Sequence, residues 1–559
     1  MAEKIQNKDQ TDYINYWLCV VGIIILMAIL HGREIDRPFY GLHSWAEATG
    51  AWTARTHVKY GLAYTKGLTT WAVGDPPIEN PKRYFDHPHL ASILLWFFGS
   101  IFGVQEWTFR FVDLLFSIPT MALFMLILKG LMKPLPALLA GLLYAIFPIT
   151  AYFSMGWSTL FGLSVIYFYL VIIKAFKDNP EPTKFHKIGL ALSLFLGLQI
   201  AWTGFFYALA IGVHYVFRCL KRKQFPSIPL LAIMALSPGI SLVITFTIML
   251  IGYGGDPTKI IELYKWRAAK GEMQQMQGFD WGLWFGKLWE FSVTDYTLPI
   301  LIIAILYITI GQLFVFMVKP DLDTGRTKRQ FPQFLLFFMV PFFALFILRG
   351  CLWKHQTWLH PMDPFVAIAA SLGIFMLWDS IKKINFKIAI VVVLAVLSLC
   401  VGYCVAGTNY YYAIRWQAES KIRMLKMINS RIPSDKYLLS FEDFVVDQHE
   451  SKGAFYRPEI AWYLDREITP ATTIEEIIKR AGTGKYPYYL MPLAVGDPQS
   501  DEYLTNLSRM LQKLYKYDYI PGEPGEIDKY HRFLKAGMPN YVLFDLRTPI
   551  IKSTDKPKD

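Results

Sequence analysis

Apolar segments long enough to cross a lipid bilayer recur along the chain from Tyr16 to Ala406, with short polar loops between them. After about Asn409 the sequence becomes charged and mixed, and no further segment of that kind follows. We therefore expect a polytopic α-helical membrane domain over residues 1–408 and a separate domain of ordinary size over residues 409–559.

About eleven of the apolar segments are predicted to span the membrane. A further stretch, from Leu90 to Val104, holds about fifteen residues, fewer than the roughly 20 that a span needs, and is typical of an interfacial or re-entrant helix. The predicted spans cover residues 15–31, 108–129, 135–153, 157–174, 187–201, 204–218, 229–252, 297–318, 332–350, 361–380 and 386–407.

The basic residues give these spans a direction. If the stretch from Leu90 to Val104 does not cross and the N-terminus is cytoplasmic, every strongly basic short loop falls on the cytoplasmic side, as the positive-inside rule requires. The loop of residues 32–107, the loop of residues 254–296 and the C-terminal domain then lie outside. The same loops account for the net charge of +12, so this charge does not indicate a nucleic-acid partner.

The C-terminal domain alternates strand-like runs, such as YLLSF and PYYLMP, with helical runs such as TTIEEIIKRA. This alternation is typical of an α/β domain. The domain contains no P-loop, no GxGxxG and no nucleophile elbow, and none of the five cysteines lies in it. We expect it to cover a site or bind a partner rather than to carry chemistry.

The external loop of residues 32–107 concentrates acids, histidines and arginines beside the bilayer. Four of its residues recur at helical spacing and predict a helix that lies along the membrane surface. Glu47 and Arg55 would project from another face of that helix. The residues at helical spacing are Trp45, Ala48, Trp52 and Thr56.

Asp36 follows the first predicted span by about five residues. A carboxylate held partly out of water at the edge of the bilayer suits a general base acting on a hydroxyl acceptor. The alternative is an interfacial ion pair with Arg33 or Arg37. Within the same loop, Arg33 and Arg55 are also candidates for lining a substrate cavity.

The motif YFDHPHL places Asp86, His87 and His89 just before the short apolar stretch. This pattern could bind a divalent metal ion through Asp86 with His43, or a phosphate through the His87 imidazole. Asp86 could equally be the N-cap of a helix that begins at Pro88. His89 is a candidate for the wall of a substrate cavity.

Other external segments carry candidate ligands for a lipid phosphate. Lys265 and Arg267 are basic residues on the side where the positive-inside rule disfavours them, and the turn RGCLWKHQTWLHPMDPF contributes His355. Trp202 and His360 could line the cavity, although anchoring in the interface is the alternative for Trp202. Aromatic residues of a second loop are predicted to form an interfacial belt: Trp281, Trp284, Phe285 and Trp289.

These motifs resemble the GT-C superfamily of membrane glycosyltransferases, within it the branch of protein O-mannosyltransferases and lipid A aminoarabinose transferases known as family 39-like. The likeness extends over about residues 15–406. An acid after the first span, FDHPHL before a short interfacial helix, the following FGVQEWTFR and the late turn KHQTWLHPMDPF carry it.

The resemblance implies an inverting transfer of a sugar from a polyprenyl-phosphate donor to an acceptor outside the membrane. It implies that Asp36 or Glu47 acts as the base, and that Asp86 and His87 lie near a metal ion or the donor phosphate. The chain departs from the family pattern at Ala46, where an acid is usual, and in the turn FSMGWSTLF, which has no acid.

We expect an integral protein of a membrane such as the bacterial inner membrane, with membrane lipids and a lipid-linked sugar as partners. The acceptor is a glycan, a lipid or a protein. Two alternatives remain open at this point. One is a polytopic transporter or lipid flippase, which Pro148 and Pro238 within predicted spans support. The other is a non-catalytic membrane assembly protein.

Overall fold

A computed structural model describes residues 2–78, 81–85, 87–153, 156–176, 180–265, 279–311, 325–352, 355–414, 419–433, 435–441, 445–447, 455–493, 498–521 and 539–550. The chain divides into two compact units. Unit 1 comprises residues 1–35, 85–91 and 110–411, and unit 2 comprises residues 36–84, 92–109 and 412–559. The chain leaves unit 1 for the last time after residue 411, close to the predicted boundary near residue 408. Most of the external loop of residues 32–107, however, belongs to unit 2 together with the C-terminal segment.

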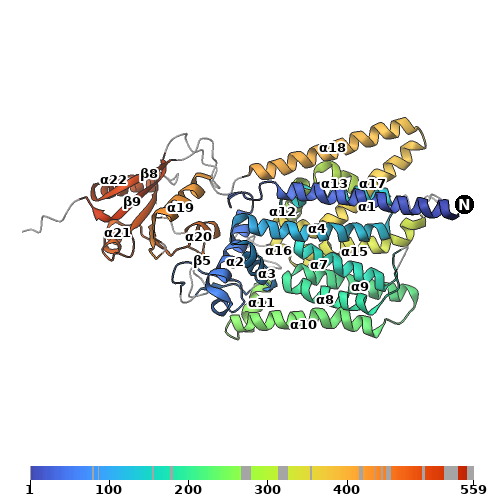
Figure 1. The fold of residues 1–559 in the computed structure, drawn as a ribbon, viewed down its shortest axis with the longest axis horizontal. Coiled ribbons are helices and arrows are strands. Elements are labelled where there is room, and N and C mark those ends of the chain that lie inside the picture. The colour runs from blue at the N-terminus through green and yellow to red at the C-terminus, as the bar shows by residue number, and fades with distance from the viewer. Residues whose placement is uncertain are drawn as a thin grey trace, which may run out of the picture. The chain divides into compact units, whose positions relative to one another are not determined.

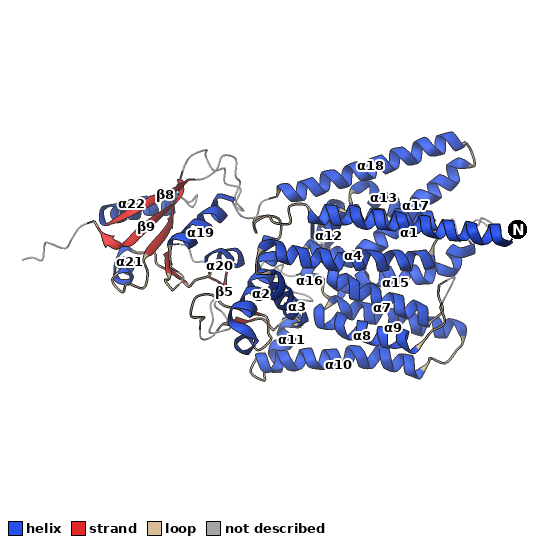
Figure 2. Cartoon of the chain, viewed as in Figure 1, coloured by secondary structure: helices blue, strands red, loops and turns tan. Residues whose placement is uncertain are grey.

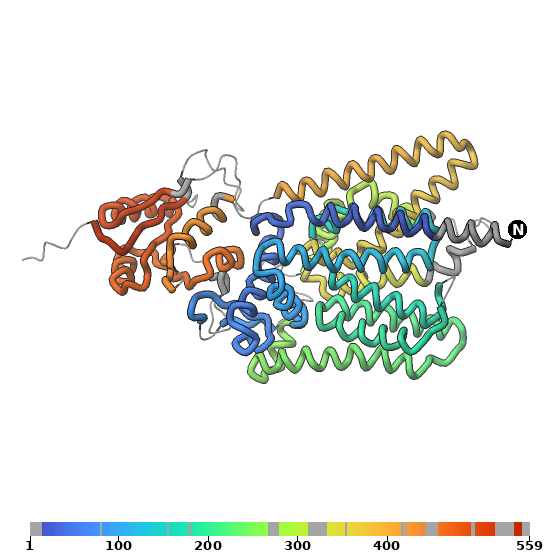
Figure 3. The backbone as a smooth tube through the Cα atoms, viewed as in Figure 1, coloured from blue at the N-terminus to red at the C-terminus, as the bar shows by residue number. Residues whose placement is uncertain are grey.

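Unit 1 is helical, and its long helices run along a common direction or its reverse (Figures 1 and 3). A π-helical turn over Tyr307–Gly311 and a 3-10 turn over Gln356–Met362 interrupt the series. The α-helices are α1 (Ala2–Gly32), α4 (Glu106–Leu131), α5 (Pro134–Ile146), α6 (Pro148–Phe153), α7 (Gly156–Ile172), α8 (Lys184–Ile200), α9 (Thr203–Arg222), α10 (Ile228–Gly252), α11 (Pro257–Lys265), α12 (Trp281–Tyr296), α13 (Leu298–Leu306), α15 (Gly325–Ile347), α16 (Arg349–Leu352), α17 (Asp363–Lys382) and α18 (Phe386–Ala413).

Each predicted span coincides with helix over most of its described residues, but the break inside the span over residues 135–153 and the sharp bend at the start of the span over residues 297–318 were not predicted. Phe147 precedes a proline, which disfavours helical backbone, and its φ of −54° and ψ of 134° separate α5 from α6. Thr297 has φ 69° and ψ 145°, and α12 meets the apolar segment 298–310 there at 108°. The predicted span over residues 135–153 is therefore two helices, and part of the span over residues 297–318 lies outside the described residues.

Six helices within the described residues are long and apolar enough to cross a membrane, or seven if the bent pair at Thr297 counts as one span. Four shorter apolar helices of 10–17 residues accompany them: Leu90–Phe102, Pro134–Ile146, Gly156–Ile172 and Gln333–Ile347. The chain is thus a multi-pass membrane protein, and the count of eleven spans stays a prediction.

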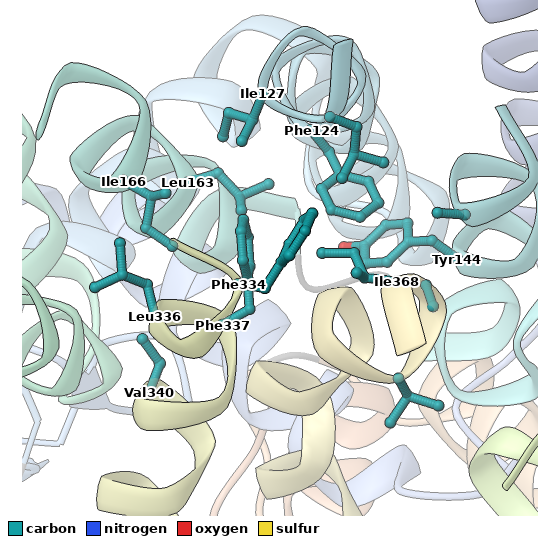
Figure 4. Close-up of a cluster of buried hydrophobic side chains, with 14 of the residues drawn as sticks. Phe124, Ile127, Tyr144, Leu163, Ile166, Phe334, Leu336, Phe337, Val340 and Ile368 are labelled. Atoms are coloured by element: carbon teal, nitrogen blue, oxygen red, sulfur yellow. The ribbon is translucent and has the colours of Figure 1, made fainter. Parts of the chain in front are cut away.

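Aromatic and branched aliphatic side chains from most helices of unit 1 form its core, and Figure 4 shows the part to which α4, α5, α7, α15 and α17 contribute. The ring of Phe124 on α4 lies 5.1 Å from that of Tyr144 on α5 and 6.4 Å from that of Phe337 on α15, between ring centroids. Leu163 of α7 and Ile368 of α17 are also buried there. This interlocking fixes the bundle, because aromatic contacts of this kind add to the free energy of burial.

Strands gather in the C-terminal part of unit 2 (Figure 2). Their five-stranded sheet has the order β6-β3-β7-β9-β8; β3 is parallel to β6 and β7, whereas β9 is antiparallel to β7 and β8. The strands are β3 (Leu438–Ser440), β6 (Ile468–Pro470), β7 (Tyr488–Pro492), β8 (Tyr515–Pro521) and β9 (Pro539–Pro549), and β4 (Val445–Asp447) pairs with β5 (Phe455–Tyr456). The helices of this part are α19 (Glu419–Arg431), α20 (Pro458–Leu464), α21 (Ile474–Ala481) and α22 (Pro498–Leu514).

The external loop forms α2 (Ser44–Thr65), the short strands β1 (Thr70–Trp71) and β2 (Lys82–Arg83), and α3 (Leu90–Phe102). Helix α2 packs on α20 within unit 2. Three residues of the face predicted to lie on the membrane, Ala48, Trp52 and Thr56, are instead buried in this unit, whereas Trp45 is exposed. The Trp52 indole donates to the Ala72 carbonyl at 2.7 Å. Periodicity predicted the helix, but it could not predict which surface would cover the apolar face.

Candidate functional site

An apolar cavity of about 1100 Å³ lies in unit 1 and is bordered by α9, α10, α11 and the segment around residues 347–358. We call it the α9–α10 cavity. Its volume lies slightly above the range of about 300–1,000 Å³ that is typical of ligand sites. Its lining includes Phe205, Leu209, Val213, Val216, Leu242, Phe246, Met249, Ile260, Tyr264, Cys351 and Trp358.

His87 and Trp202, both singled out from the sequence, lie together on the wall of this cavity. Among its described lining residues, His87 is the one whose side chain can carry charge near neutral pH. Trp202 packs beside Phe205 and Phe246, with ring centroids 6.4 and 6.3 Å apart. A cavity with apolar walls and one imidazole suits a molecule that joins a long hydrocarbon to an anion.

The segment that carries His87 is held against the end of α10. The Phe85 ring approaches Gly252 so closely that a Cβ at this glycine would lie 2.3 Å from the ring, and the same ring lies 6.0 Å from that of Tyr253. Gly252 is thus required by the close approach. The FDHPHL motif therefore reaches the cavity because an aromatic residue two positions before His87 is packed there.

His89, two residues further on, behaves differently from His87. Its side chain is 7% exposed, and its ring lies 6.5 Å from that of Phe85. Burial lowers the pKa of His89 to about 4, because the cationic form loses its hydration. A neutral, buried imidazole indicates a packing role, and His89 is not among the residues that line the cavity.

The predicted phosphate ligands are placed unequally. Lys265 is exposed at the end of α11, directly after Tyr264 of the cavity wall. His355 is half-buried, and its backbone N–H donates to the carbonyl of Cys351, another lining residue, at 3.3 Å. Arg267 and Asp86 lie outside the described residues, so their places in the site remain predictions.

A buried polar cluster occupies the region where α6, α12, α17 and the turn Gln356–Met362 meet. Asp363 Oδ2 accepts hydrogen bonds from His360 Nδ1 at 2.8 Å and from the Thr150 hydroxyl at 3.3 Å. Asp363 Oδ1 accepts from the Tyr296 hydroxyl at 2.8 Å. Both Asp363 and His360 are at most 5% exposed, so this network is closed to solvent.

A second buried acid extends the cluster. Asp295 is fully buried, and its Oδ1 accepts from the Tyr411 hydroxyl and, at 3.2 Å, from Gln356 Nε2. Gln356 and His360 both belong to the 3-10 turn that also carries Trp358 of the cavity wall. The cluster, defined as Thr150, Asp295, Tyr296, Gln356, His360, Asp363 and Tyr411, thus fixes the turn, and His360 acts as a positioning residue rather than as part of the lining.

The two candidate bases lie in unit 2 and differ in their surroundings. Glu47 forms an ion pair with Arg37 at 3.1 Å, and the Arg37 guanidinium lies 5.1 Å from the centroid of the Tyr412 ring. Asp36 is exposed, and within the described residues it forms no ion pair. The carboxylate of Glu47 is thus committed to a buried arginine, whereas that of Asp36 is accessible.

The two arginines predicted to line a cavity make other contacts. Arg33, in unit 1, donates to Asn409 Oδ1 at 2.6 Å. Arg55, in unit 2, donates to the Ala461 carbonyl at 2.8 Å and pairs with Asp465 at 3.4 Å. Burial lowers the pKa of Arg55, and the nearby Asp465 carboxylate acts against this shift. Both arginines therefore join segments that are far apart in the sequence.

The metal pair is only partly described. His43 is buried in unit 2 and has left-handed backbone, with φ 56° directly before α2, while Asp86 lies outside the described residues. No group of three or more His, Cys, Asp and Glu in the described part of the chain could hold a metal ion. The described residues alone therefore do not form a metal site, and the pair of Asp86 with His43 stays a prediction.

Sequence reasoning did not identify the cavity walls or Asp295. Phe205, Leu209 and Phe246 belong to long apolar segments whose pattern says that they contact lipid or protein, without saying which. Asp295 had a usable signal: an acid beside an apolar span is costly in a membrane protein and marks an important position.

Comparison with known proteins shows which family model and which solved structures this chain resembles. Residues 86–246 match the family model described as dolichyl-phosphate-mannose-protein mannosyltransferase. No curated protein matches the sequence of the chain.

Solved structures match nearly the whole fold. ArnT from Cupriavidus metallidurans, bound to undecaprenyl phosphate, is 12% identical, with a TM-score of 0.55 over 98% of this chain and 100% of that chain. The archaeal oligosaccharyltransferase AglB from Archaeoglobus fulgidus, in complex with an inhibitory peptide and a dolichol-phosphate, is 10% identical, with a TM-score of 0.53 over 94% of this chain and 75% of that chain. The arabinofuranosyltransferase AftD from Mycobacteria is 11% identical, with a TM-score of 0.50 over 95% of this chain and 40% of that chain.

The family match covers the segment from the FDHPHL motif into α10, which includes His87, Trp202 and most of the cavity walls contributed by α9 and α10. The structural matches extend the likeness over both units. The chain is therefore a multi-pass membrane protein whose fold is similar to those of the transferases ArnT, AglB and AftD, and its residues 86–246 match the mannosyltransferase family model.

Proposed function

We propose that the protein transfers a sugar from a polyprenyl-phosphate donor to a hydroxyl acceptor at the external side of the membrane, with inversion at the anomeric carbon. The observation that carries this proposal is the α9–α10 cavity, which joins a long apolar wall to the imidazole of His87. Hydrocarbon gains free energy by leaving water, and the imidazole can donate a hydrogen bond to a phosphate oxygen.

The donor is proposed to place its prenyl chain against α9 and α10 and its phosphate toward His87. Lys265 and His355 flank residues of the same wall, and Arg267 follows Lys265 by two positions in the sequence. Two of the solved structures with this fold were obtained with undecaprenyl phosphate or a dolichol-phosphate, which supports a lipid phosphate as ligand.

In the proposed reaction, the acceptor oxygen forms a bond to the anomeric carbon while the bond from this carbon to the phosphate oxygen breaks. The acceptor proton passes to the base, and the electron pair of the broken bond stays on polyprenyl phosphate. Cationic donors near the phosphate stabilise the charge that develops on this leaving group. No nucleotide takes part, in keeping with the lack of nucleotide-binding motifs in the C-terminal domain.

Asp36 is the base that we favour over Glu47. The Glu47 carboxylate is engaged by Arg37 at 3.1 Å, whereas the Asp36 carboxylate is exposed and could accept a proton from an acceptor hydroxyl. Asp36→Asn should abolish transfer while the protein still folds, and Glu47→Gln should retain measurable transfer. Full activity of Asp36→Asn would contradict this assignment.

Two glycines allow a direct test of the cavity. Gly212 on α9 and Gly239 on α10 both line it, and a Cβ at either position would have no atom within 4 Å. Phenylalanine at these positions should fill the cavity without displacing the backbone. We expect Gly212→Phe and Gly239→Phe to weaken donor use by about tenfold or more, measured as release of labelled polyprenyl phosphate from a labelled polyprenyl-phosphate sugar.

Gly402 on α18 provides the matched control. It is exposed, it has the same open surroundings, and it does not line the cavity. Gly402→Phe should leave both the KM for the donor and the melting temperature unchanged. If all three variants behave alike, the cavity is not the donor site; if labelled lipid crosses the membrane without losing its sugar, the protein is a transporter instead.

A further inference from the structure

A second cavity in unit 1, of about 460 Å³, lies between the ends of α7, α8 and α9 and the start of α10. We call it the basic pocket. Four cationic side chains line it, from three different parts of the chain: Lys174, Lys187, Arg218 and Arg222. The positive-inside rule predicts this end of the helices to be cytoplasmic, so the pocket is distinct from the proposed transfer site.

The positive charge of the basic pocket is largely uncompensated. Lys174 pairs with Glu181 at 2.8 Å, but within the described residues no carboxylate forms an ion pair with Lys187, Arg218 or Arg222. Gathering three like charges around one cavity is unfavourable unless an anion joins them.

A hydrogen bond to the backbone holds the Arg218 side chain in place. This side chain is half-buried, and one Nη2–H donates to the Ile173 carbonyl at 2.6 Å. A guanidinium has five N–H donors, so this anchor leaves others for an anion in a fixed orientation. The pocket floor is fixed as well, because the Tyr215 hydroxyl accepts from the Ser227 backbone N–H at 2.8 Å.

Apolar side chains adjoin the cations. Phe225 and Leu230 line the pocket, and Phe225 is fully exposed in the structure. Nearby, Phe217, Leu220 and Ile228 are each at least 70% exposed. A soluble anion would leave this surface uncovered, whereas the acyl chains of a lipid would cover it.

We propose that the basic pocket binds the phosphate of an anionic glycerophospholipid, with Lys187, Arg218 and Arg222 around the headgroup and the acyl chains against Phe225. Basic pockets between transmembrane helices on the cytoplasmic side are suited to such headgroups. The lipid would lie where α8, α9 and α10 meet, and α9 and α10 also form the walls of the α9–α10 cavity. This inference does not depend on the proposed transferase reaction.

The test compares two double variants of the full-length protein that change the net charge equally. Lys187→Gln with Arg222→Gln removes two cations of the pocket. Lys221→Gln with Lys223→Gln removes two exposed cations of the same loop that do not line it. Each protein is purified in phosphatidylcholine nanodiscs that contain a small fraction of phosphatidylglycerol, and bound phosphatidylglycerol is counted by native mass spectrometry.

We expect the pocket variant to retain phosphatidylglycerol about tenfold more weakly than the unmodified chain, and the control variant to retain it unchanged. Equal loss in both variants would show general surface attraction and would overturn the proposal, as would no loss in either. Displacement of the lipid by millimolar inorganic phosphate would show that the pocket holds a free phosphate instead.

Discussion

The α9–α10 cavity and the buried polar cluster belong to the same unit and even share the turn Gln356–Met362, yet they are built in opposite ways. The cavity has apolar walls, open space and one imidazole. The cluster has two buried carboxylates, and hydroxyl, amide and imidazole groups fill the space around them. The first arrangement leaves room for a ligand, whereas the acids of the second accept hydrogen bonds from side chains of the same cluster.

This difference shows that a polar side chain in a membrane domain can either contact a ligand, as proposed for His87, or hold helices together, as in the cluster. Buried acids without partners are very costly, so acids whose partners are all internal act as fixed joints between helices. The cavity can tolerate substitutions in its lining, because its apolar side chains do not depend on hydrogen bonds to one another. Variants of the cluster should therefore affect stability most, and variants of the cavity should affect the donor most.

The largest effect is expected for Asp363→Ala. This variant leaves His360 Nδ1, Tyr296 and Thr150 without their common acceptor, and breaking such a buried network costs about 3–5 kcal/mol. Thermal unfolding in detergent measures the loss. Asp363→Asn keeps one acceptor oxygen and should lose clearly less; an unchanged melting temperature for Asp363→Ala would contradict the view of the cluster as a joint.

The next effect concerns His89, the buried neighbour of His87. Its folded pKa of about 4 lies below the ordinary value of 6.5, so the unfolded chain takes up the proton first as the pH falls. The native protein should lose stability from pH 6.5 down to about 4, by about 2 kcal/mol at pH 5 from this residue. His89→Phe should flatten the loss in that range, and an unaltered pH profile would show that His89 is accessible to water.

A smaller change in stability is expected for Leu209→Gln on the cavity wall. Because Leu209 is 38% exposed beside open space, the amide should remain hydrated, and the change in unfolding free energy should stay below about 1 kcal/mol. The KM for the donor should rise, since a polar group replaces a contact of the prenyl chain. A variant with lower stability and a normal KM would show that Leu209 contributes to the fold rather than to the donor site.

The smallest effect is expected for Glu290→Gln, which provides a reference on the same helix as Asp295. Glu290 pairs with Lys287 at 2.8 Å on the exposed side of α12. Exposed pairs at this spacing contribute about 0.2–0.5 kcal/mol, and added salt reduces this. A loss as large as that of Asp363→Ala would show that α12 is far more sensitive than its burial pattern indicates.

Much of the fold could be predicted from the sequence, because periodicity and length determine helices directly. The helices around residues 108–129 and 229–252, the short helix from Leu90 and the strand of residues 488–492 all follow from local patterns. The break at Phe147 had a visible cause in Pro148. The break at Thr297 coincides with the predicted start of the span over residues 297–318, and Pro299 is its visible cause, whereas the 108° bend there was not predicted.

The site was only partly predictable for the same reason. His87 and Trp202 were singled out separately, and only the structure shows that they share one cavity. Trp284 was predicted to belong to an interfacial belt, but it is fully buried and its indole donates to the Arg349 carbonyl at 3.0 Å. Aromatic spacing identifies a helix face, whereas the covering of this face depends on residues far away in the sequence.

The composition of unit 2 has a consequence for how the protein is made. The hydroxyl of Ser44 donates to Glu459, 415 residues later, at 3.0 Å. At about 5–20 residues per second, a ribosome needs about 20–80 s to reach Glu459 after Ser44 has been added. During this time α2 has left the ribosome without α20, so Ser44 and Arg55 lack their partners on α20 until synthesis is nearly complete. The nascent protein should therefore depend on a chaperone at the membrane that shields this early segment, and premature termination before residue 458 should leave it exposed to proteases.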